Sequence, residues 1–309
     1  MDTCYQLLIV DTTAQTLLVV DGLTNAILAE LVLPPTEAIT GIYPAADGNK
    51  VFLPAAGNGG NGSLHILNLA NYTLYRLPVA ISHPEYFALQ QAIAHFADPA
   101  GNIYRLDTAT LALMPEKTNT AQLSCMSLAT QGGQLFALWE DGTEGLFSIL
   151  NAQGQLLREY RLPGAPTAMA IAPNGMAYIA LAGENQQVGL AAIGRDAGEL
   201  LPTALKLTCP HCKAPLTGYP IDLALTANTI YIITEEGALT VVDRQTLHPT
   251  YYMLLGQPLD KIHLLPDTNQ AIGLSVMKGN LARIDLSAGR ITALTATSHY
   301  LGPMAVIRK

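Results

Sequence analysis

The sequence has few charged residues and no long apolar run, and each shortage excludes a class of protein. Charged residues make up only 13% of the 309, and the formal net charge is -8. A surface that binds nucleic acid needs clustered Lys and Arg, and no such cluster occurs, so we expect no nucleic-acid partner. The longest apolar runs, such as LLVV and AMAIA, fall far short of the roughly 20 residues of a membrane-spanning helix.

Familiar catalytic and targeting motifs are also missing. Neither G-x-S-x-G nor H-E-x-x-H occurs. The opening MDTCYQLLIV lacks the basic and apolar regions of a signal peptide. Few Lys, many Ala, Leu, Thr and Gln, and a close cysteine pair nevertheless favour an exported protein, periplasmic or extracellular, whose leader is absent from this chain. A cytoplasmic location is the alternative.

The sequence does contain a repeat. An apolar strand ending in Asp or Asn before a small polar turn recurs about every 44 residues. The instances end at Asp21, Asn68, Asp107, Asn151, around Arg195, and at Asp243 and Asp285. This period is that of one four-stranded propeller blade, about 40–45 residues. No segment shows a sustained helical period, so the sequence predicts an all-β fold with almost no helix.

A second repeated unit marks where the blades begin. It is a small residue followed by Pro and an alternating strand, at Pro84, Pro166, Pro220, Pro258 and Pro303. The chain enters at a second strand, YQLLIVD, and ends with a spare first strand, GPMAVIRK. We therefore expect a single ring of seven blades, closed by the C-terminal strand completing the N-terminal blade. The expected blades are 1–33 plus 303–309, 34–81, 82–118, 119–163, 164–208, 209–256 and 257–302.

These units resemble the seven-bladed propellers with YVTN-type repeats. The segments GAPTAMAIAPNGMAYIALAGENQQVGLAAIG and GYPIDLALTANTIYIITEEGALTVVDRQT carry the resemblance, with YIAL and YIIT in place of a literal YVTN. The family includes exported binding and surface proteins, and its relatives include lactonases, cytochrome-containing reductases and metal carriers. The resemblance therefore implies a fold and leaves the function open.

The segment TCPHCKAPLT, with Cys209, His211 and Cys212, is an insertion between the fifth and sixth blades. It falls on the face that carries the connections between blades, which we call the top face. A C-x-x-C pair is a common half-site for zinc or copper. The favoured interpretation is a local disulfide or a pair of free thiols, with a disulfide if the protein is exported. A redox centre is least favoured because no helix is expected beneath it, and Lys213 in place of His excludes covalent haem.

Other residues are expected on the top face. His83 and His299 lie in connections between blades and are candidates for completing a metal site with the cysteine pair. Carboxylates near the start of first strands, Glu37, Asp222 and Asp260, with Glu85 one position earlier, are candidates for binding a cation or a positive ligand at the channel mouth. Trp139 is a candidate for stacking against a ligand, with core packing as the favoured alternative.

Three functions remain open from the sequence. The first is a non-enzymatic binding or scaffold propeller of a bacterial cell envelope, with a protein or small-molecule partner on the top face. The second is a metal-binding or metal-delivery propeller that uses Cys209, His211, Cys212, His299 and His83. The third is a lactonase-like hydrolase with a cation held by Glu37, Asp222 and Asp260.

Overall fold

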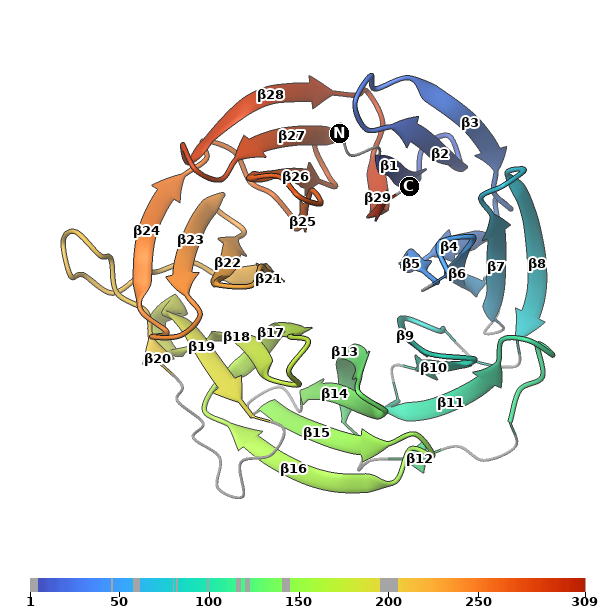
Figure 1. The fold of residues 1–309 in the computed structure, drawn as a ribbon, viewed down its shortest axis with the longest axis horizontal. Coiled ribbons are helices and arrows are strands. Elements are labelled where there is room, and N and C mark those ends of the chain that lie inside the picture. The colour runs from blue at the N-terminus through green and yellow to red at the C-terminus, as the bar shows by residue number, and fades with distance from the viewer. Residues whose placement is uncertain are drawn as a thin grey trace.

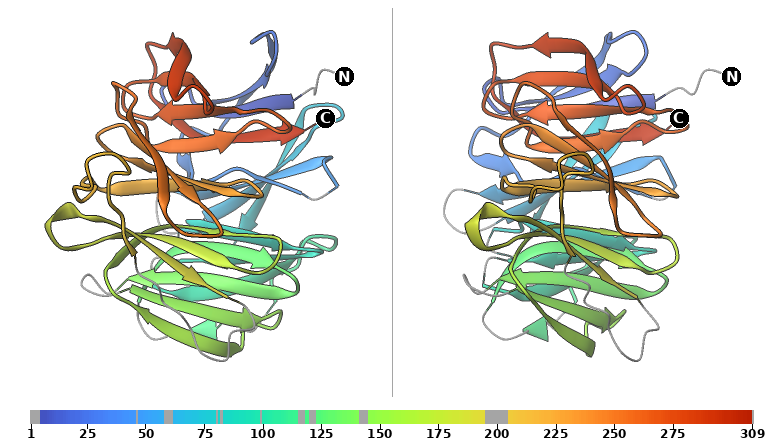
Figure 2. Two further views of the ribbon diagram at one scale, coloured as in Figure 1. Left: turned by 60° about the vertical axis from the view of Figure 1, so that its left-hand side comes forward. Right: turned by 90° about the vertical axis from the view of Figure 1, so that its left-hand side faces the viewer.

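A computed structural model describes residues 5–308 except 46, 58–61, 80, 82, 99, 115–117, 120–122, 141–144 and 195–204. In this part of the chain, seven antiparallel sheets stand in a ring around a central channel (Figure 1). The side views of Figure 2 show these blades edge on. The prediction of a seven-bladed, all-β propeller is confirmed, and the one helical turn described is the 3-10 turn Glu184–Gln186.

The strands of each blade follow one another from the channel outwards. Blade 1 contains β29 (Leu301–Arg308), β1 (Tyr5–Asp11), β2 (Thr16–Asp21) and β3 (Ile27–Val32). Blade 2 contains β4 (Glu37–Ile39) and β5 (Tyr43–Pro44), then β6 (Lys50–Gly57), β7 (Gly62–Asn68) and β8 (Thr73–Val79). Blade 3 contains β9 (Tyr86–Gln90), β10 (Ile93–Ala97), β11 (Asn102–Asp107) and β12 (Thr118–Asn119). Blade 4 contains β13 (Ser124–Gln131), β14 (Gln134–Glu140), β15 (Gly145–Asn151) and β16 (Leu156–Leu162).

The remaining blades have the same order. Blade 5 contains β17 (Ala165–Ile171), β18 (Ala177–Ala182), β19 (Val188–Ile193) and β20 (Leu205–Lys206). Blade 6 contains β21 (Pro220–Leu225), β22 (Thr229–Thr234), β23 (Ala238–Asp243) and β24 (Pro249–Leu254). Blade 7 contains β25 (Lys261–Leu264), β26 (Gln270–Ser275), β27 (Asn280–Asp285) and β28 (Arg290–Ala296).

The C-terminal strand closes the ring as predicted. β29 pairs antiparallel with β1, with Leu7 opposite Val306 and Leu8 opposite Ala305. In this way blade 1 combines strands from the two halves of the chain, and β1 and β29 lie side by side in Figure 1. Such closure leaves no unpaired edge between the first and last blades.

The repeated Asp or Asn residues end the third strand of their blades. The carboxylate of Asp243, for example, accepts hydrogen bonds from the N–H groups of Gln245 and Thr246. These bonds turn the chain back into the fourth strand, which explains why Asp and Asn recur there. The instance around Arg195 follows β19, and Arg195 itself lies outside the described residues.

The core lies between the blades. Buried residues of the described chain form seven clusters, and each cluster is shared by two neighbouring blades. Alternate side chains of a strand point to opposite neighbours, so a middle strand such as β1 is buried on both faces. This explains runs such as LLIV. No helix in the described part of the chain is long and apolar enough to cross a membrane.

Candidate functional site

Polar residues converge on an opening of about 570 Å³ at the channel mouth. Its lining comes from blades 1, 2, 3, 4, 6 and 7. The charged residues among the lining are Glu85, Asp222, Asp260 and Lys261. The three carboxylates lie within or directly before the first strands of their blades, on the side that receives the connections between blades. The sequence-based prediction for Asp222 and Asp260, with Glu85, therefore coincides with a defined opening.

Backbone hydrogen bonds fix the orientation of the two aspartates. Asp222 Oδ2 accepts the N–H of Ile262 at 2.9 Å, which links blade 6 to blade 7. Asp260 Oδ2 accepts the N–H of Val276 at 2.6 Å. Each carboxylate thereby keeps one oxygen, Oδ1, outside these bonds. The Nζ of Lys261 lies 3.6 Å from Asp222 Oδ1, so this ammonium is the internal competitor for a bound cation.

A β-bulge places Asp222 in the channel. The pairing of β21 with β22 shifts register between Pro220 and Asp222. The first strands of blades 4 and 5 have a register shift at the corresponding point, after Cys125 and after Pro166. An extra residue in one strand re-aims the side chains that follow it. The motif proline therefore marks the position, and the bulge determines which side chain enters the channel.

The opening carries net negative charge. Three carboxylates and one ammonium sum to -2 among its lining residues. Burial lowers the pKa of His263, so this residue is neutral at neutral pH. Burial raises the pKa of Tyr43 and of Tyr86 to about 12, and the Glu85 carboxylate adds to the effect at Tyr86. Both phenols are therefore neutral, and both rings line the opening.

Glu37 lies elsewhere, which corrects its assignment to the channel mouth. Its side chain is buried between blades 1 and 2, where Ser63 Oγ donates to Oε2 at 2.8 Å and His65 Nε2 lies 2.6 Å from the same oxygen. Arg76 donates to Oε1 from the Nε and Nη2 atoms. Glu37 pairs in regular register with Gly57, without the bulge that turns Asp222 inwards. The proposed cation site of Glu37, Asp222 and Asp260 is consequently not assembled.

Trp139 belongs to the core, which corrects its assignment as a ligand-stacking residue. The ring is fully buried on β14, among residues of blades 3 and 4. Its N–H donates to Ser148 Oγ at 3.0 Å. A buried ring with its polar atom paired has no face left for a ligand. Part of the loop that follows, residues 141–144, lies outside the described residues.

The cysteine pair forms the tip of a β-hairpin at the rim. Thr208 bridges Pro215, and the N–H of Cys209 bonds to the carbonyl of Ala214 at 2.8 Å. Lys213 turns the chain with a φ of 61°. The gold segment after β20 in Figure 1 projects outwards beside β24. The inserted segment is therefore an outward hairpin rather than a loop over the channel.

Cys209 and Cys212 are free thiols, so the disulfide expected for an exported protein is absent. The N–H of Cys212 lies 3.4 Å from Cys209 Sγ and donates to it. This bond, the Cys212 thiol and the N–H of His211 lower the pKa of Cys209. Backbone donors that converge on one sulfur favour the thiolate, the form that binds metal ions.

The two histidines proposed to complete a metal site lie apart from this tip. His299 Nδ1 is 2.5 Å from Asp11 Oδ2, at the junction of blades 7 and 1. His83 precedes β9 and has a φ of 47°. Within the described residues, no group of three or more His, Cys, Asp or Glu side chains is placed to hold a metal ion. A single-chain site made from all five predicted ligands is therefore not assembled.

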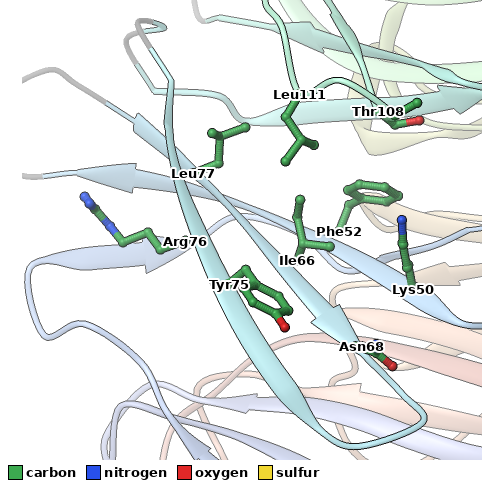
Figure 3. Close-up of a pocket in the computed structure, with 10 residues that line it drawn as sticks. Lys50, Phe52, Ile66, Asn68, Tyr75, Arg76, Leu77, Thr108 and Leu111 are labelled. Atoms are coloured by element: carbon green, nitrogen blue, oxygen red, sulfur yellow. The ribbon is translucent and has the colours of Figure 1, made fainter.

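A second cavity, of about 370 Å³, lies on the outside of blades 2 and 3. Figure 3 shows Phe52, Ile66 and Leu77 pointing into it, while the Arg76 side chain extends away from it. The latter direction agrees with the pairing of Arg76 with Glu37. None of the ten candidate site residues named from the sequence lines this cavity. The channel opening is where polar groups converge, and it is the stronger candidate for a functional site.

Several residues that line the channel opening were not predicted from the sequence. Lys261 and His263 lie on β25 and Tyr43 on β5, and none carries a motif. Their inward direction depends on strand register, which a single sequence does not specify residue by residue. The Pro-x-Asp spacing in GYPIDLAL and GQPLDKIH was the sequence signal for this opening, and it pointed to Asp222 and Asp260.

Comparisons with solved structures identify the fold class of the chain. Among solved structures, the chain is similar to dihydro-heme d1 dehydrogenase NirN in complex with DHE (TM-score 0.66, 15% identity), covering 95% of this chain and 63% of that one. It is similar to apo AztD from Citrobacter koseri (TM-score 0.62, 13% identity), covering 99% and 98%. It is also similar to the Cps50 (Swd1) β-propeller domain of Myceliophteria thermophila (TM-score 0.65, 10% identity), covering 86% and 91%.

The chain is thus a seven-bladed β-propeller. No family model matches it, and no curated protein matches it. At these identities the likeness concerns the fold alone, and solved propellers of this shape include an enzyme and a domain named only by its fold.

Proposed function

We propose that this protein is a non-enzymatic binding propeller that takes a small organic cation at the channel mouth. The observation that carries the proposal is the 570 Å³ opening with Glu85, Asp222 and Asp260 among its lining residues. An opening of this size is typical of small-molecule sites, which are about 300–1,000 Å³. Backbone bonds hold the two aspartates in place, so binding does not have to order them.

The arrangement favours an extended cation over a metal ion. The carboxylates of the described residues are too far apart for three of them to share one ion. A molecule with several amino groups reaches separate carboxylates and places its charge near the rings of Tyr43 and Tyr86. Spermidine has this chemistry and is a suitable probe.

Calorimetric titration with spermidine tests the proposal. We expect the double variant Asp222→Asn/Asp260→Asn to bind about tenfold more weakly than the wild type, because each exposed ion pair contributes up to about 1 kcal/mol. Asn keeps the acceptor for the backbone N–H groups of Ile262 and Val276, so the fold is preserved. The matched control is Glu30→Gln/Asp47→Asn, two exposed carboxylates outside the opening. Equal affinities for the two double variants would contradict the proposal.

The family and compartment belong to the same proposal. We propose that the repeats are of the YVTN type and that the protein works in a bacterial cell envelope, where the top face meets a ligand or a partner. The repeat pattern and the composition support this placement. Fractionation of the native host, with detection by an antibody, tests it; recovery in the cytoplasmic fraction alone would contradict it.

A second candidate function is metal binding at the rim hairpin, with zinc or copper as the ion. The observation that favours it is the pair of free thiols Cys209 and Cys212, with a Cys209 pKa lowered by backbone N–H groups. Elemental analysis of protein purified without added metal, beside Cys209→Ser/Cys212→Ser, tests it. We expect zinc or copper in the wild type and its loss in the variant; no metal in either would contradict it.

A further inference from the structure

We propose that the rim hairpin is half of a zinc site that a second copy of this chain completes, so that zinc joins two propellers. The ion is coordinated by Cys209 and Cys212 of both copies. This inference rests on the second candidate function, metal binding at the hairpin, and is independent of cation binding at the channel mouth.

The hairpin holds two thiols at its tip, an exposed one on Cys212 and a partly buried one on Cys209. Its stem is anchored: the N–H of Leu207 bonds to the carbonyl of Val188, and the N–H of Val188 bonds to the carbonyl of Leu216. Leu207 and Leu216 are buried in the cluster between blades 5 and 6, and Cys209 packs against that cluster. Cys212 is exposed at the tip. A rigid stem under an exposed C-x-x-C tip pre-orders one edge of a tetrahedral site.

Within the described part of the chain, no further pair of ligands lies beside the two cysteines. Zinc in structural sites takes four ligands, and the described residues offer no group of three that can hold an ion. Glu236 is the rival ligand to be tested: burial raises the pKa of Tyr252, and the charges of Cys209, Glu236 and Cys212 raise it further. The Glu236 carboxylate is held over Gly218, where a Cβ would lie 2.5 Å from Oε2. We therefore assign the remaining two ligands to another molecule.

A second copy of the chain can supply the two further zinc ligands, and its charges suit the completed site. Two copies that meet by a two-fold axis present the same pair to each other and give four thiolates, a recurrent zinc environment. Zinc with four thiolates has a net charge of -2. Lys213 is held on the tip by a 2.7 Å bond from Nζ to the carbonyl of Pro210, and its charge also lowers the pKa of Cys209. Two copies bring two such ammonium groups, which offset that charge.

The test uses the whole protein, stripped of metal and kept reduced. Zinc is added in steps, bound zinc is measured after gel filtration, and the mass is measured by light scattering on the same column. We expect about one zinc per two chains and a dimer that a chelator returns to monomer. In a parallel titration with cobalt, strong sulfur-to-cobalt absorption and tetrahedral ligand-field bands are expected.

Variants separate the proposal from its rivals. Cys209→Ser and Cys212→Ser should each abolish both zinc binding and dimer formation, while His211→Ala and Glu236→Gln should keep both. One zinc per monomer, or loss of zinc in Glu236→Gln, would overturn the second-copy site and leave metal binding at the hairpin standing. Absence of any zinc would overturn both. Spermidine binding should be unchanged in the cysteine variants, so these outcomes are distinct from a failure at the channel mouth.

Discussion

The buried carboxylate of Glu37 should make the stability of the propeller depend on pH in acid. Burial alone would raise the pKa of Glu37, but hydrogen bonds from Arg76, His65 and Ser63 outweigh it and lower the pKa from 4.5 to about 2. A lowered folded-state pKa means that the folded protein prefers the ionised carboxyl. Its contribution is therefore complete above about pH 4.5 and is lost as the pH falls through about 2.

The magnitude follows from the size of the shift. A shift of about 2.5 pKa units corresponds to about 3 kcal/mol, of which about 2 kcal/mol is lost between pH 7 and about pH 3. Urea unfolding at a series of pH values measures this loss. The single tryptophan, Trp139, is fully buried, so its fluorescence reports unfolding.

The variant Glu37→Gln isolates this carboxyl. We expect its free energy of unfolding to change with pH by about 2 kcal/mol less than that of the wild type over the same range. The matched control is Glu30→Gln, which removes an exposed carboxyl of β3 and should leave the dependence unchanged. Identical pH dependence in the wild type and Glu37→Gln would refute the reasoning.

Three further predictions concern buried or strained positions. His95 is fully buried with no hydrogen-bond partner among the described residues, and burial lowers its pKa to about 4. The folded protein therefore resists protonation of His95, and the wild type loses stability as the pH falls. In urea titrations, the free energy of unfolding of His95→Leu should gain about 3 kcal/mol relative to that of the wild type between pH 6.5 and below pH 4. Iodoacetamide should alkylate Cys209 in the native protein and Cys125 only after unfolding, as read by peptide mass spectrometry, because Cys125 is buried and burial raises its pKa; native labelling of Cys125 would contradict this. Gly237→Ala should lower the free energy of unfolding by at least about 2 kcal/mol, because φ is 81° and the new Cβ would lie 1.9 Å from the carbonyl oxygen of Gln257; an unchanged melting temperature would contradict it.

The fold was predictable because its physical causes repeat. In six of the seven blades the third strand ends in an Asp or Asn, as at Asp107 and Asp285, whose side chain caps the following turn, and this local chemistry recurs periodically in the sequence. The need to pair the edge strand of the first blade explains the spare strand at the C-terminus, which became β29. The turn caps depend on residues close together in the sequence, and ring closure depends only on the order of the strands. Both can therefore be recognised in a single sequence.

The site was predictable only in part because side-chain direction depends on register. Asp222 and Glu37 occupy comparable places in the sequence, yet a bulge turns Asp222 into the channel and regular pairing leaves Glu37 facing blade 1. A shift of one residue exchanges the two faces of a strand. The hairpin at Cys209 is recognisable as an insertion, but its outward direction follows from pairing with Val188, far away in the sequence.

The central claim is that the net negative charge of the channel mouth binds a cation. The most direct test compares the cation affinity of a variant that loses a positive charge with that of a variant that loses two negative charges. Spermidine is titrated calorimetrically into the wild type, Lys261→Met and Asp222→Asn/Asp260→Asn in one buffer. Lys261 lies beside Asp222, and its ammonium competes with a bound cation for the Oδ1 atom of Asp222. We predict tighter binding by Lys261→Met and weaker binding by the aspartate variant. Equal affinities for all three proteins, or changes of the same sign in both variants, would contradict the account.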